Sequence, residues 1–361
     1  MIEKLVNKLE IDNQAINILL AGFPTYPRNF SRDSFCSLFL LEDTELLKNQ
    51  IIYSSYLQGQ KFDNYTGEEI GKVHHEYPGV ELNGKNTQYN ACDTTALYLI
   101  AHLKYQELTE DCSLAQKYQK NIHLAVEYII DHINDEGLFI EKQADCVQNC
   151  FAVSVTYWKD SVLSKRAKDD HFFPVFYYLA HCMNLAAIRA ASKILNTSQY
   201  QDIENKMLEG LHYLFQTHSH FPVAFDQQGL ISMESSDFIH SLYYLQNGDL
   251  TSVELDWISD QAQKIATGFG YLVNPKYLCN PKHSYHSCTL WPFEQAFIYI
   301  GAKKFQLNDI VNVAKRIYNK THTYPEIIYV DNQTFDEGGN NPQLWTFACF
   351  EYFKKELELD K

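Results

Sequence analysis

Five short segments of this chain combine aromatic residues with carboxylates, the mixture of side chains that a sugar-binding pocket needs. Flat aromatic faces pack on sugar rings, whereas carboxylates accept hydrogen bonds from hydroxyl groups and transfer protons. The segments lie far apart in sequence, and each adjoins a stretch with helical periodicity. We therefore expect the ends of several helices to bring them into one pocket. The segments are Tyr26–Asp33, His74–Tyr77, Tyr157–Ser161, Leu290–Glu294 and Tyr324–Glu326.

Helical periodicity dominates the rest of the chain and predicts the elements that would position these segments. Apolar residues recur at helical spacing in Phe176–Ala190 and in Phe293–Ile300, as they do on the buried face of a helix. Long irregular stretches separate many of the helices, and long ordered loops often carry function. The pattern predicts helices at residues 12–21, 31–42, 44–58, 88–107, 114–133, 172–195, 198–217, 235–247, 252–267, 287–303, 307–320 and 341–356.

This order of helices and loops also predicts the fold class. Long loops between alternate helices favour six helical hairpins in a ring, an all-α (α/α)6 barrel whose alternate loops converge at one end. No linker rich in proline, glycine or serine divides the chain, so we expect residues 1–361 to form a single domain. Gly22 predicts the end of the first helix, and Asn341 followed by Pro342 predicts the start of the last.

Composition limits the classes of partner. The 361 residues carry a formal net charge of −15, which argues against nucleic acid and anionic membrane surfaces as partners. No apolar stretch is long enough to span a membrane, and Met1–Leu5 lacks a basic segment followed by an apolar run, so we expect no signal peptide. We expect a cytoplasmic protein with a neutral substrate.

The cysteines predict reduced thiols rather than a metal or disulfide site. Nine cysteines, an odd number, are scattered along the chain without a framework. Cys146 and Cys150 could form a redox or metal pair, but free thiols are the preferred interpretation. The stretch Cys279–Cys288 contains two cysteines and two histidines, but their spacing is more compressed than in the usual structural zinc sites. We expect no metal and no cofactor.

Seven segments, in this order, resemble the motifs of (α/α)6-barrel glycosidases. The first, Arg32-Asp33-Ser34, is similar to their R-D-S or R-D-F opening. The later matches are His74–Tyr77 to P-H-E, Tyr89–Leu97 to Y-x-S-x-D-A-T-P-L, Trp158–Ser161 to W-x-D-S, Leu290–Ala296 to V-W-P-W-D/E-x-A, Tyr324–Glu326 to L-P-E-L/F and Asn341–Trp345 to S-P-Q-A-W. The resemblance spans about residues 20–350 and is greatest to the glucosidase domain of glycogen debranching enzymes (amylo-α-1,6-glucosidases) and to glucoamylase- and trehalase-like enzymes.

This resemblance implies an inverting hydrolase in which Asp160 is the general acid and Glu326 the general base. A carboxyl group beside Trp158 is expected to be desolvated, which would raise its pKa and keep it protonated near neutral pH. Lys159 would oppose this effect if its amine pointed inward. Asp160 could instead be a turn or cap residue. Glu326 could be a surface glutamate, with local rivals at Asp331, Asp336 and Glu337.

The resemblance also implies which residues bind the sugar. Arg32 would supply a planar set of donors and Asp33 an acceptor, although Asp33 could merely favour the first turn of a helix that Ser31 caps. The other candidates, each of which could serve the core or a bracing network instead, are His75, Glu76, Asp93, Trp158, Trp291, Glu294 and Trp345.

The sequence therefore predicts a glycoside hydrolase, an α-glucosidase of an oligosaccharide or disaccharide. A small substrate is favoured because the chain lacks the additional domains that are common in relatives acting on glycogen. Two alternatives from other classes remain open. One is a sugar epimerase on the same barrel, with bases among His74, His75, His283 and His286. The other is a carbohydrate-binding protein without activity.

Overall fold

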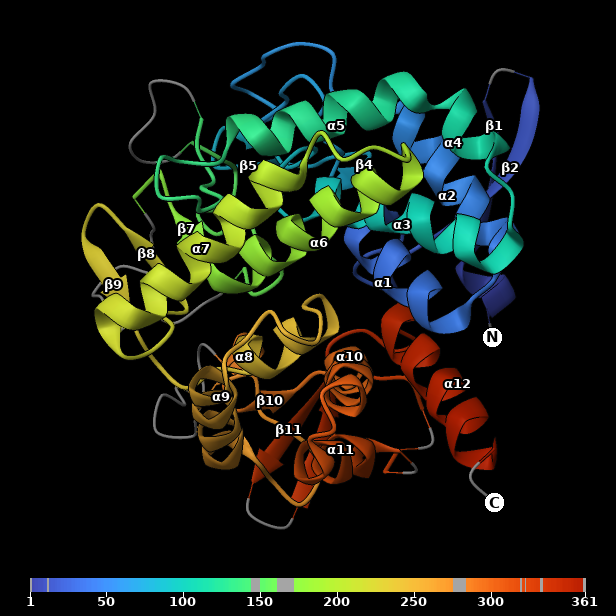
Figure 1. The fold of residues 1–361 in the computed structure, drawn as a ribbon. Coiled ribbons are helices and arrows are strands. Elements are labelled where there is room, and N and C mark those ends of the chain that lie inside the picture. Colours follow the sequence, from blue (N-terminus) through green and yellow to red (C-terminus); the bar gives the residue numbers. More distant parts are fainter. Residues whose placement is uncertain are drawn as a thin grey trace.

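The computed structural model describes residues 2–11, 13–143, 150–160, 172–274, 284–318, 320–321, 323–331 and 334–359. Helices dominate these residues, and short strands lie between them (Figure 1). The α-helices are α1 (Ser31–Leu41), α2 (Thr44–Tyr56), α3 (Thr94–Thr109), α4 (Ser113–Lys117), α5 (Gln119–Asp131), α6 (Tyr178–Ile194), α7 (Gln201–His218), α8 (Asp237–His240), α9 (Ser252–Ile265), α10 (Pro292–Lys304), α11 (Asn308–Ala314) and α12 (Leu344–Leu359). The 3-10 helices are η1 (Ile2–Leu5), η2 (Ser241–Tyr243), η4 (Ser284–His286) and η5 (Lys315–Ile317).

The strands form small antiparallel sheets rather than a central one. Three are pairs: β1 (Val6–Ile11) with β2 (Gln14–Leu19), β3 (Asn29–Phe30) with β4 (Glu76–Tyr77), and β5 (Glu81–Leu82) with β6 (Lys85–Asn86). Two have three strands, in the order β7 (Phe176–Tyr177), β8 (Ala224–Asp226), β9 (Gly229–Ile231) and in the order β10 (Thr289–Leu290), β11 (Ile327–Asp331), β12 (Thr334–Gly338).

Six helices contact one another in a closed circuit, which can be followed in Figure 1. α1 packs against α3, α3 against α6, α6 against α8, α8 against α10, α10 against α12, and α12 against α1. The helices that follow in sequence lie outside this circuit. α2 packs on α1 and α3, α5 on α3 and α6, α7 on α6, α9 on α8, and α11 on α10. The chain therefore alternates between inner and outer helices.

The burial of the helices matches these two positions. Every residue of α1 from Ser31 to Leu40 is buried, as expected of a helix surrounded by others. The outer helix α5 buries only one face, made of residues at helical spacing. These are Ile122, Ala125, Val126, Tyr128 and Ile129.

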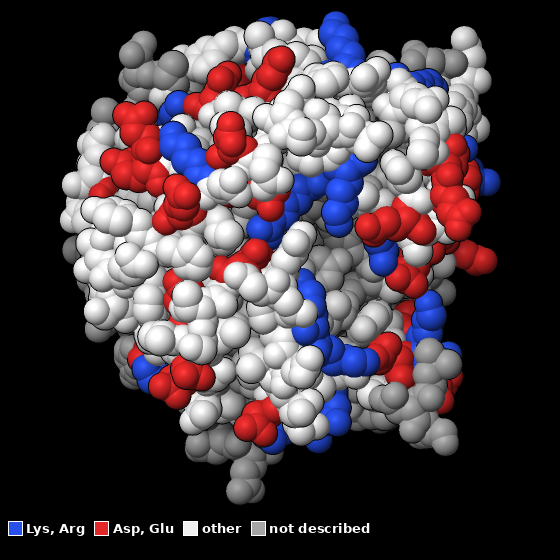
Figure 2. Space-filling model, viewed as in Figure 1, with Lys and Arg blue, Asp and Glu red and all other residues white. Residues whose placement is uncertain are grey.

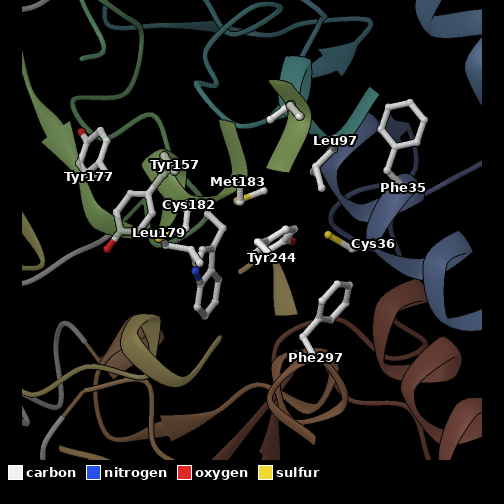
Figure 3. Close-up of a cluster of buried hydrophobic side chains, with 14 of the residues drawn as sticks. Phe35, Cys36, Leu97, Tyr157, Tyr177, Leu179, Cys182, Met183, Tyr244 and Phe297 are labelled. Carbon is white, nitrogen blue, oxygen red and sulfur yellow. The ribbon is translucent and has the colours of Figure 1, made fainter. Parts of the chain in front are cut away.

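Large side chains fill the centre of the circuit, as the close-up in Figure 3 shows. The residues drawn there come from four inner helices and include Phe35 from α1, Leu97 from α3, Leu179 from α6 and Phe297 from α10, together with Tyr244. These side chains are buried and belong to one continuous hydrophobic core. The inner helices are thus held by packing, and the pocket described below lies at their ends.

The predicted first helix, at residues 12–21, is wrong, because this segment belongs to the β1–β2 hairpin. Ile16 and Ile18 are buried whereas Ala15 is exposed, a period of two that fits a strand and not a helix. Asn13 has a left-handed backbone (φ 61°), as the tight turn of a hairpin requires. Gly22 therefore ends no helix. The other predicted helices each overlap an observed one, although residues 114–133 are divided between α4 and α5.

The predicted start of the last helix is also displaced. α12 begins at Leu344, and Asn341 and Pro342 precede it in an irregular segment. The backbone N–H of Asn341 donates to the Phe23 carbonyl oxygen (3.0 Å), and that of Leu344 donates to Ala21 (2.8 Å). Tertiary hydrogen bonds thus replace the cap that the sequence predicts.

The prediction of reduced thiols is wrong at two positions. Cys150 and Cys288 are disulfide-bonded. Disulfide pairing depends on where the fold brings the Cβ atoms together, which sequence spacing does not specify. Because two cysteines are paired, the cysteines no longer argue for a reducing compartment. Cys146, Cys279 and His283 lie outside the described residues. The free thiols among the described residues are Cys36, Cys92, Cys112, Cys182 and Cys349.

Two features are absent from the described residues. None of their helices is long and apolar enough to cross a membrane. They also contain no cluster of three or more histidines, cysteines or acidic residues arranged to hold a metal ion. On the face shown in Figure 2, Lys and Arg side chains lie among Asp and Glu side chains.

Gly301 tests the packing of α10 on η2. A Cβ atom at this position would lie 2.5 Å from the backbone nitrogen of Tyr243. Gly301→Ala would gain about 1 kcal/mol of helix propensity. Overpacking against backbone costs about 1–3 kcal/mol, so we expect a net loss of stability, measured as a lower midpoint of unfolding in urea by circular dichroism. Gly268→Ala is the control, because its Cβ atom would meet nothing within 4 Å. Equal midpoints for both variants would contradict the close approach of these elements.

Candidate active site

A pocket with a cavity volume of about 70 Å³ collects residues from all five of the aromatic and acidic segments. Eight of the eleven residues predicted to form the site line it: Arg32, Asp33, His75, Trp158, Asp160, Trp291, Glu326 and Trp345. Five further residues line the pocket, and the sequence predicted only His286 among them, as a possible epimerase base: Ala21, Tyr26, Phe30, Tyr285 and His286. Tyr26 and Phe30 lie inside the first predicted segment, so a signal for them existed.

The other three predicted residues do not line the pocket, because each carboxylate has partners elsewhere. Glu76 contacts the Nε atom of Arg28 and accepts a hydrogen bond from the Thr87 hydroxyl. Glu294 is completely buried and accepts a hydrogen bond from the Ser236 hydroxyl (2.7 Å). The third, Asp93, is the partner of Arg32.

The Arg32–Asp93 ion pair holds the guanidinium group of Arg32 in place at the pocket. The Nε and Nη2 atoms of Arg32 each lie 2.9 Å from a carboxylate oxygen of Asp93, and Nη2 also lies 3.3 Å from the Thr156 carbonyl oxygen. Arg32 is in the first turn of α1, and Asp93 directly precedes α3. Asp93 therefore orients Arg32 instead of facing the pocket itself.

Ser31 does not cap α1, contrary to one interpretation of the sequence. Its hydroxyl donates to the carbonyl oxygens of His74 and His75, and the N-cap residue is Phe30, whose side chain makes no capping bond. The helix start is thus tied to the neighbouring loop, which holds Arg32 and Asp33 at the pocket.

Asp160 faces the pocket because Lys159 faces away from it. The Lys159 Nζ atom is completely buried and lies 2.8 Å from an Asp237 carboxylate oxygen and 2.8 Å from the Ser235 hydroxyl. The Asp160 side chain is 46% exposed, and its Oδ1 atom lies 3.5 Å from Nδ1 of His286. The ammonium group of Lys159 is thereby committed to Asp237 and does not approach the carboxyl group beside it.

The surroundings of Asp160 suit a group that releases a proton. Although the Asp160 side chain is partly exposed, desolvation by the surrounding pocket walls raises the pKa of its carboxyl group to about 6. The Arg32 guanidinium lowers this pKa and the Glu326 carboxylate raises it. An acid with such a pKa keeps a protonated fraction near neutral pH while still able to give up its proton.

Glu326 is held by three neighbours. Its side chain is 3% exposed and accepts hydrogen bonds from the Tyr285 hydroxyl and, at 2.8 Å, from the Asn340 backbone N–H. Gly339 has φ +72°, and a Cβ atom there would lie 2.4 Å from Oε2 of Glu326, so glycine is required for this close approach. The rival carboxylates Asp336 and Glu337 are exposed on β12.

Burial raises the pKa of Glu326, and the hydrogen bonds from Tyr285 and Asn340 oppose that effect. Burial also raises the pKa of Asp33, to about 8, with Arg32 opposing and Glu326 adding to the shift. Asp33 is therefore protonated near neutral pH. Its Oδ1 atom accepts a hydrogen bond from Gln343 (3.2 Å).

Three tryptophans form one aromatic wall of the pocket. The rings of Trp158 and Trp291 meet edge to face at 5.6 Å, and those of Trp291 and Trp345 at 5.2 Å. Each is at least nine-tenths buried, so only part of each ring reaches the pocket. The indole N–H groups of Trp158 and Trp345 have no hydrogen-bond partner among the described residues, which leaves two donors near the pocket.

Two histidines, His75 and His286, also line the pocket. Burial, with the positive charge of Arg32, lowers the pKa of both imidazoles well below the ordinary value, so both are neutral. His74 lies behind the pocket, where its Nε2 atom is 3.3 Å from Oδ1 of Asn29.

Replacing Asp33 tests its raised pKa. The folded protein holds a proton on Asp33 between about pH 4 and pH 8 that the unfolded chain releases, so this group makes stability fall as pH rises through that window. Asp33→Asn resembles the protonated form. We expect its stability relative to wild type to increase with pH, by at most about 1.4 kcal/mol per pH unit, measured by urea unfolding from pH 5 to pH 9. Asp309→Asn, at an exposed carboxylate, should show no such trend. A constant difference between Asp33→Asn and wild type would refute the shift.

Replacing Tyr285 tests its hydrogen bond to Glu326. The bond stabilises the ionised carboxylate, so Tyr285→Phe should raise the pKa of Glu326. Carbon-13 NMR titration of the labelled Glu326 carboxyl group measures this directly. Tyr329→Phe is a matched control, because Tyr329 is an exposed tyrosine on β11. An unchanged or lowered Glu326 pKa in Tyr285→Phe would show that the hydroxyl does not serve the carboxylate.

No family model and no curated protein sequence matches the chain. Solved structures do match. GH63 mannosylglycerate hydrolase from Thermus thermophilus, in complex with glucose, gives a TM-score of 0.62 at 11% sequence identity over 94% of this chain and 95% of that one. The structure of the hydrolase with Tris and D-glycerate gives 0.62 at 11% identity, over 94% and 96%. An uncharacterized conserved protein from the same organism gives 0.62 at 11%, over 94% and 95%. The chain therefore has a fold similar to that of GH63 mannosylglycerate hydrolase.

Proposed function

We propose that this protein is a glycoside hydrolase in which Asp160 is the general acid and Glu326 the general base. One observation carries the proposal. Three carboxyl groups with raised pKa values, those of Asp33, Asp160 and Glu326, line a single pocket that three tryptophans enclose, and the motif resemblance assigns the acid and the base to Asp160 and Glu326. The fold shared with a GH63 hydrolase supports the same conclusion.

The proposed reaction proceeds with inversion, as the motif resemblance implies. Asp160 protonates the glycosidic oxygen as the bond to the leaving group breaks. Glu326 removes a proton from a water molecule that attacks the anomeric carbon from the opposite face. This mechanism requires about 6.5–9.5 Å between the two carboxyl groups, whereas about 5–5.5 Å would favour a covalent intermediate.

The other lining residues have roles that follow from their chemistry. Arg32 donates to sugar hydroxyls with the part of its guanidinium group that Asp93 does not occupy. Protonated Asp33 can both donate and accept a hydrogen bond there. The rings of Trp158 and Trp345 exclude water from the leaving group.

We further propose that the closed circuit of inner helices is an (α/α)6 barrel and that residues 1–361 form one catalytic domain. The alternation of inner and outer helices supports both proposals. The reaction as written uses only side chains of this chain, and no cofactor takes part in it.

The proposed substrate is an uncharged oligosaccharide or disaccharide with an α-linked glucose. Among the described lining residues, three carboxyl groups face one guanidinium group, which favours an uncharged ligand over an anionic one. A glycosylglycerate is the alternative, because the similar GH63 structures are of a mannosylglycerate hydrolase.

A sugar epimerase is the second candidate. Neutral His75 and His286 line the pocket and could act as bases. The hydrolase is favoured because Asp160 also faces the pocket.

Product analysis after incubation with maltose, isomaltose, trehalose, glucosylglycerate and mannosylglycerate tests the proposal. We expect release of the monosaccharide from at least one compound. Asp160→Asn and Glu326→Gln should each lower kcat by about 10²–10⁴-fold, the usual contribution of a general acid or base. Asp336→Asn, on the same hairpin as Glu326, should retain wild-type activity.

The pH profile and the product anomer sharpen this test. A plot of kcat/KM against pH should fall above about pH 6, where Asp160 loses its proton, and should also fall at low pH, where Glu326 is protonated. Proton NMR of the first product should show the inverted anomer. Full hydrolysis by both variants would reject the assigned pair, and epimerised sugar without hydrolysis would establish the second candidate.

A further inference from the structure

We propose that a second groove, next to the pocket, binds a neutral oligosaccharide at a site separate from the reaction. The groove has a cavity volume of about 300 Å³, compared with about 70 Å³ for the pocket. It lies between the β1–β2 hairpin, the C-terminal end of α2 and strand β4. This volume is at the lower end of the range of ordinary small-molecule sites, about 300–1,000 Å³.

Tyrosine rings give the groove its affinity for sugars. Tyr56 is 61% exposed and Tyr77 is 40% exposed, although both are large aromatic residues. The buried ring of Tyr53 packs edge to face on Tyr77 at 6.4 Å, which limits the motion of the exposed ring. Tyrosine offers a flat apolar face with a hydroxyl at its edge, and such rings gather in binding sites where one side of the ligand is apolar and the other polar.

The polar groups that line the groove suit an uncharged ligand with many hydroxyl groups. Asn7, Glu10 and Arg28 line the groove and together supply donors and acceptors to a polyhydroxylated ligand. Glu10 and Arg28 carry opposite charges, so the lining favours an uncharged ligand. Arg28 also contacts Glu76, whereas a purely aliphatic ligand would leave Asn7 and Glu10 without partners.

The floor of the groove is rigid before any ligand binds. Ile11, Ile16 and Ile18 from the hairpin form a separate hydrophobic cluster with Tyr53 of α2. This cluster fastens the hairpin to the helix. A preformed groove avoids the cost of ordering its walls when the ligand binds.

A single two-stranded ribbon separates the groove from the pocket. In the β3–β4 pair, Asn29 lies opposite Tyr77, and both line the groove. The neighbouring residues Phe30 and His75 line the pocket. The guanidinium of Arg28 lies 5.0 Å from the centre of the Phe30 ring and so belongs to the partition. A saccharide in the groove would therefore leave the pocket free for a second one.

Methyl NMR of isoleucine-labelled full-length protein tests the proposal, because Ile11 and Ile18 line the groove. The probes are maltotetraose, cellotetraose and α-1,6-mannotetraose at millimolar concentrations. We expect at least one of them to shift the methyl resonances of both residues. Tyr56→Ala and Tyr77→Ala should each weaken this binding by about threefold to tenfold.

The controls separate the groove from the reaction site. Tyr213→Ala removes a tyrosine with the same 61% exposure on the outer helix α7 and should leave binding unchanged. Tyr56→Phe, which keeps the ring, should retain most of it. Glu326→Gln should also leave groove binding unchanged, so the proposal stands or falls independently of hydrolysis.

Several results would overturn the groove proposal. One is the absence of shifts at Ile11 and Ile18 with all three tetraoses. Another is equal affinity of wild type, Tyr56→Ala and Tyr77→Ala. A third is tyrosine-dependent binding of octanoate without binding of any tetraose, which would identify a site for aliphatic ligands.

Discussion

The buried ion pair between Arg32 and Asp93 is the interaction on which the pocket depends. It joins the first turn of α1 to the residue before α3, so neither helix start can shift without separating two buried charges. Pairs of this kind contribute little net stability, but loss of one partner leaves an uncompensated charge that costs about 3–5 kcal/mol. The pair thus fixes the position of the start of α1 relative to the start of α3. It also supplies the positive charge that moderates the pKa values of Asp33 and Asp160.

Backbone hydrogen bonds extend this constraint to Glu326. The N–H of Glu326 donates to the Asn340 carbonyl oxygen (2.8 Å), and the N–H of Asn340 donates to the Glu326 carboxylate (2.8 Å). The N–H of Gln343 donates to Tyr324, and that of Leu344 to Ala21. The segment before α12 therefore connects the base of the β11–β12 hairpin to the chain before α1. The proposed acid and base lie on loops, but each loop is anchored to an inner helix or its neighbour.

The sequence predicts which residue types form the site, but not which way each side chain points. Trp291 and Glu294 come from one predicted segment, yet Trp291 lines the pocket while Glu294 faces Ser236 and His240 near α8. Residues three apart on a helix share a face, but Trp291 precedes the helix in an extended conformation and escapes that rule. No sequence pattern predicts Tyr285 as a site residue, because its contact with Glu326 joins residues 41 positions apart.

The errors in the fold have a related origin. Amphipathic helices were found because their periodicity is local, whereas the β1–β2 hairpin was missed because its period of two extends over only six residues per strand. The disulfides of Cys150 and Cys288 depend on tertiary contacts in the same way. Asn341 and Pro342 match a common capping pattern. The N–H of Asn341 donates instead to the carbonyl oxygen of Phe23, a tertiary contact that the local sequence does not predict.

Short strands take the place of side-chain caps at several inner helices, and this explains how the site is built. Phe30, Tyr177 and Trp291 are extended N-cap residues that make no side-chain capping bond, and each follows or ends a two-residue strand. The first N–H of α1 donates to His75, and that of α6 donates to Val223. Each bond satisfies one of the four N–H groups that a helix start leaves without a partner inside the helix. Polar side chains in the first turn are then free to face a ligand, as Arg32 and Asp33 do.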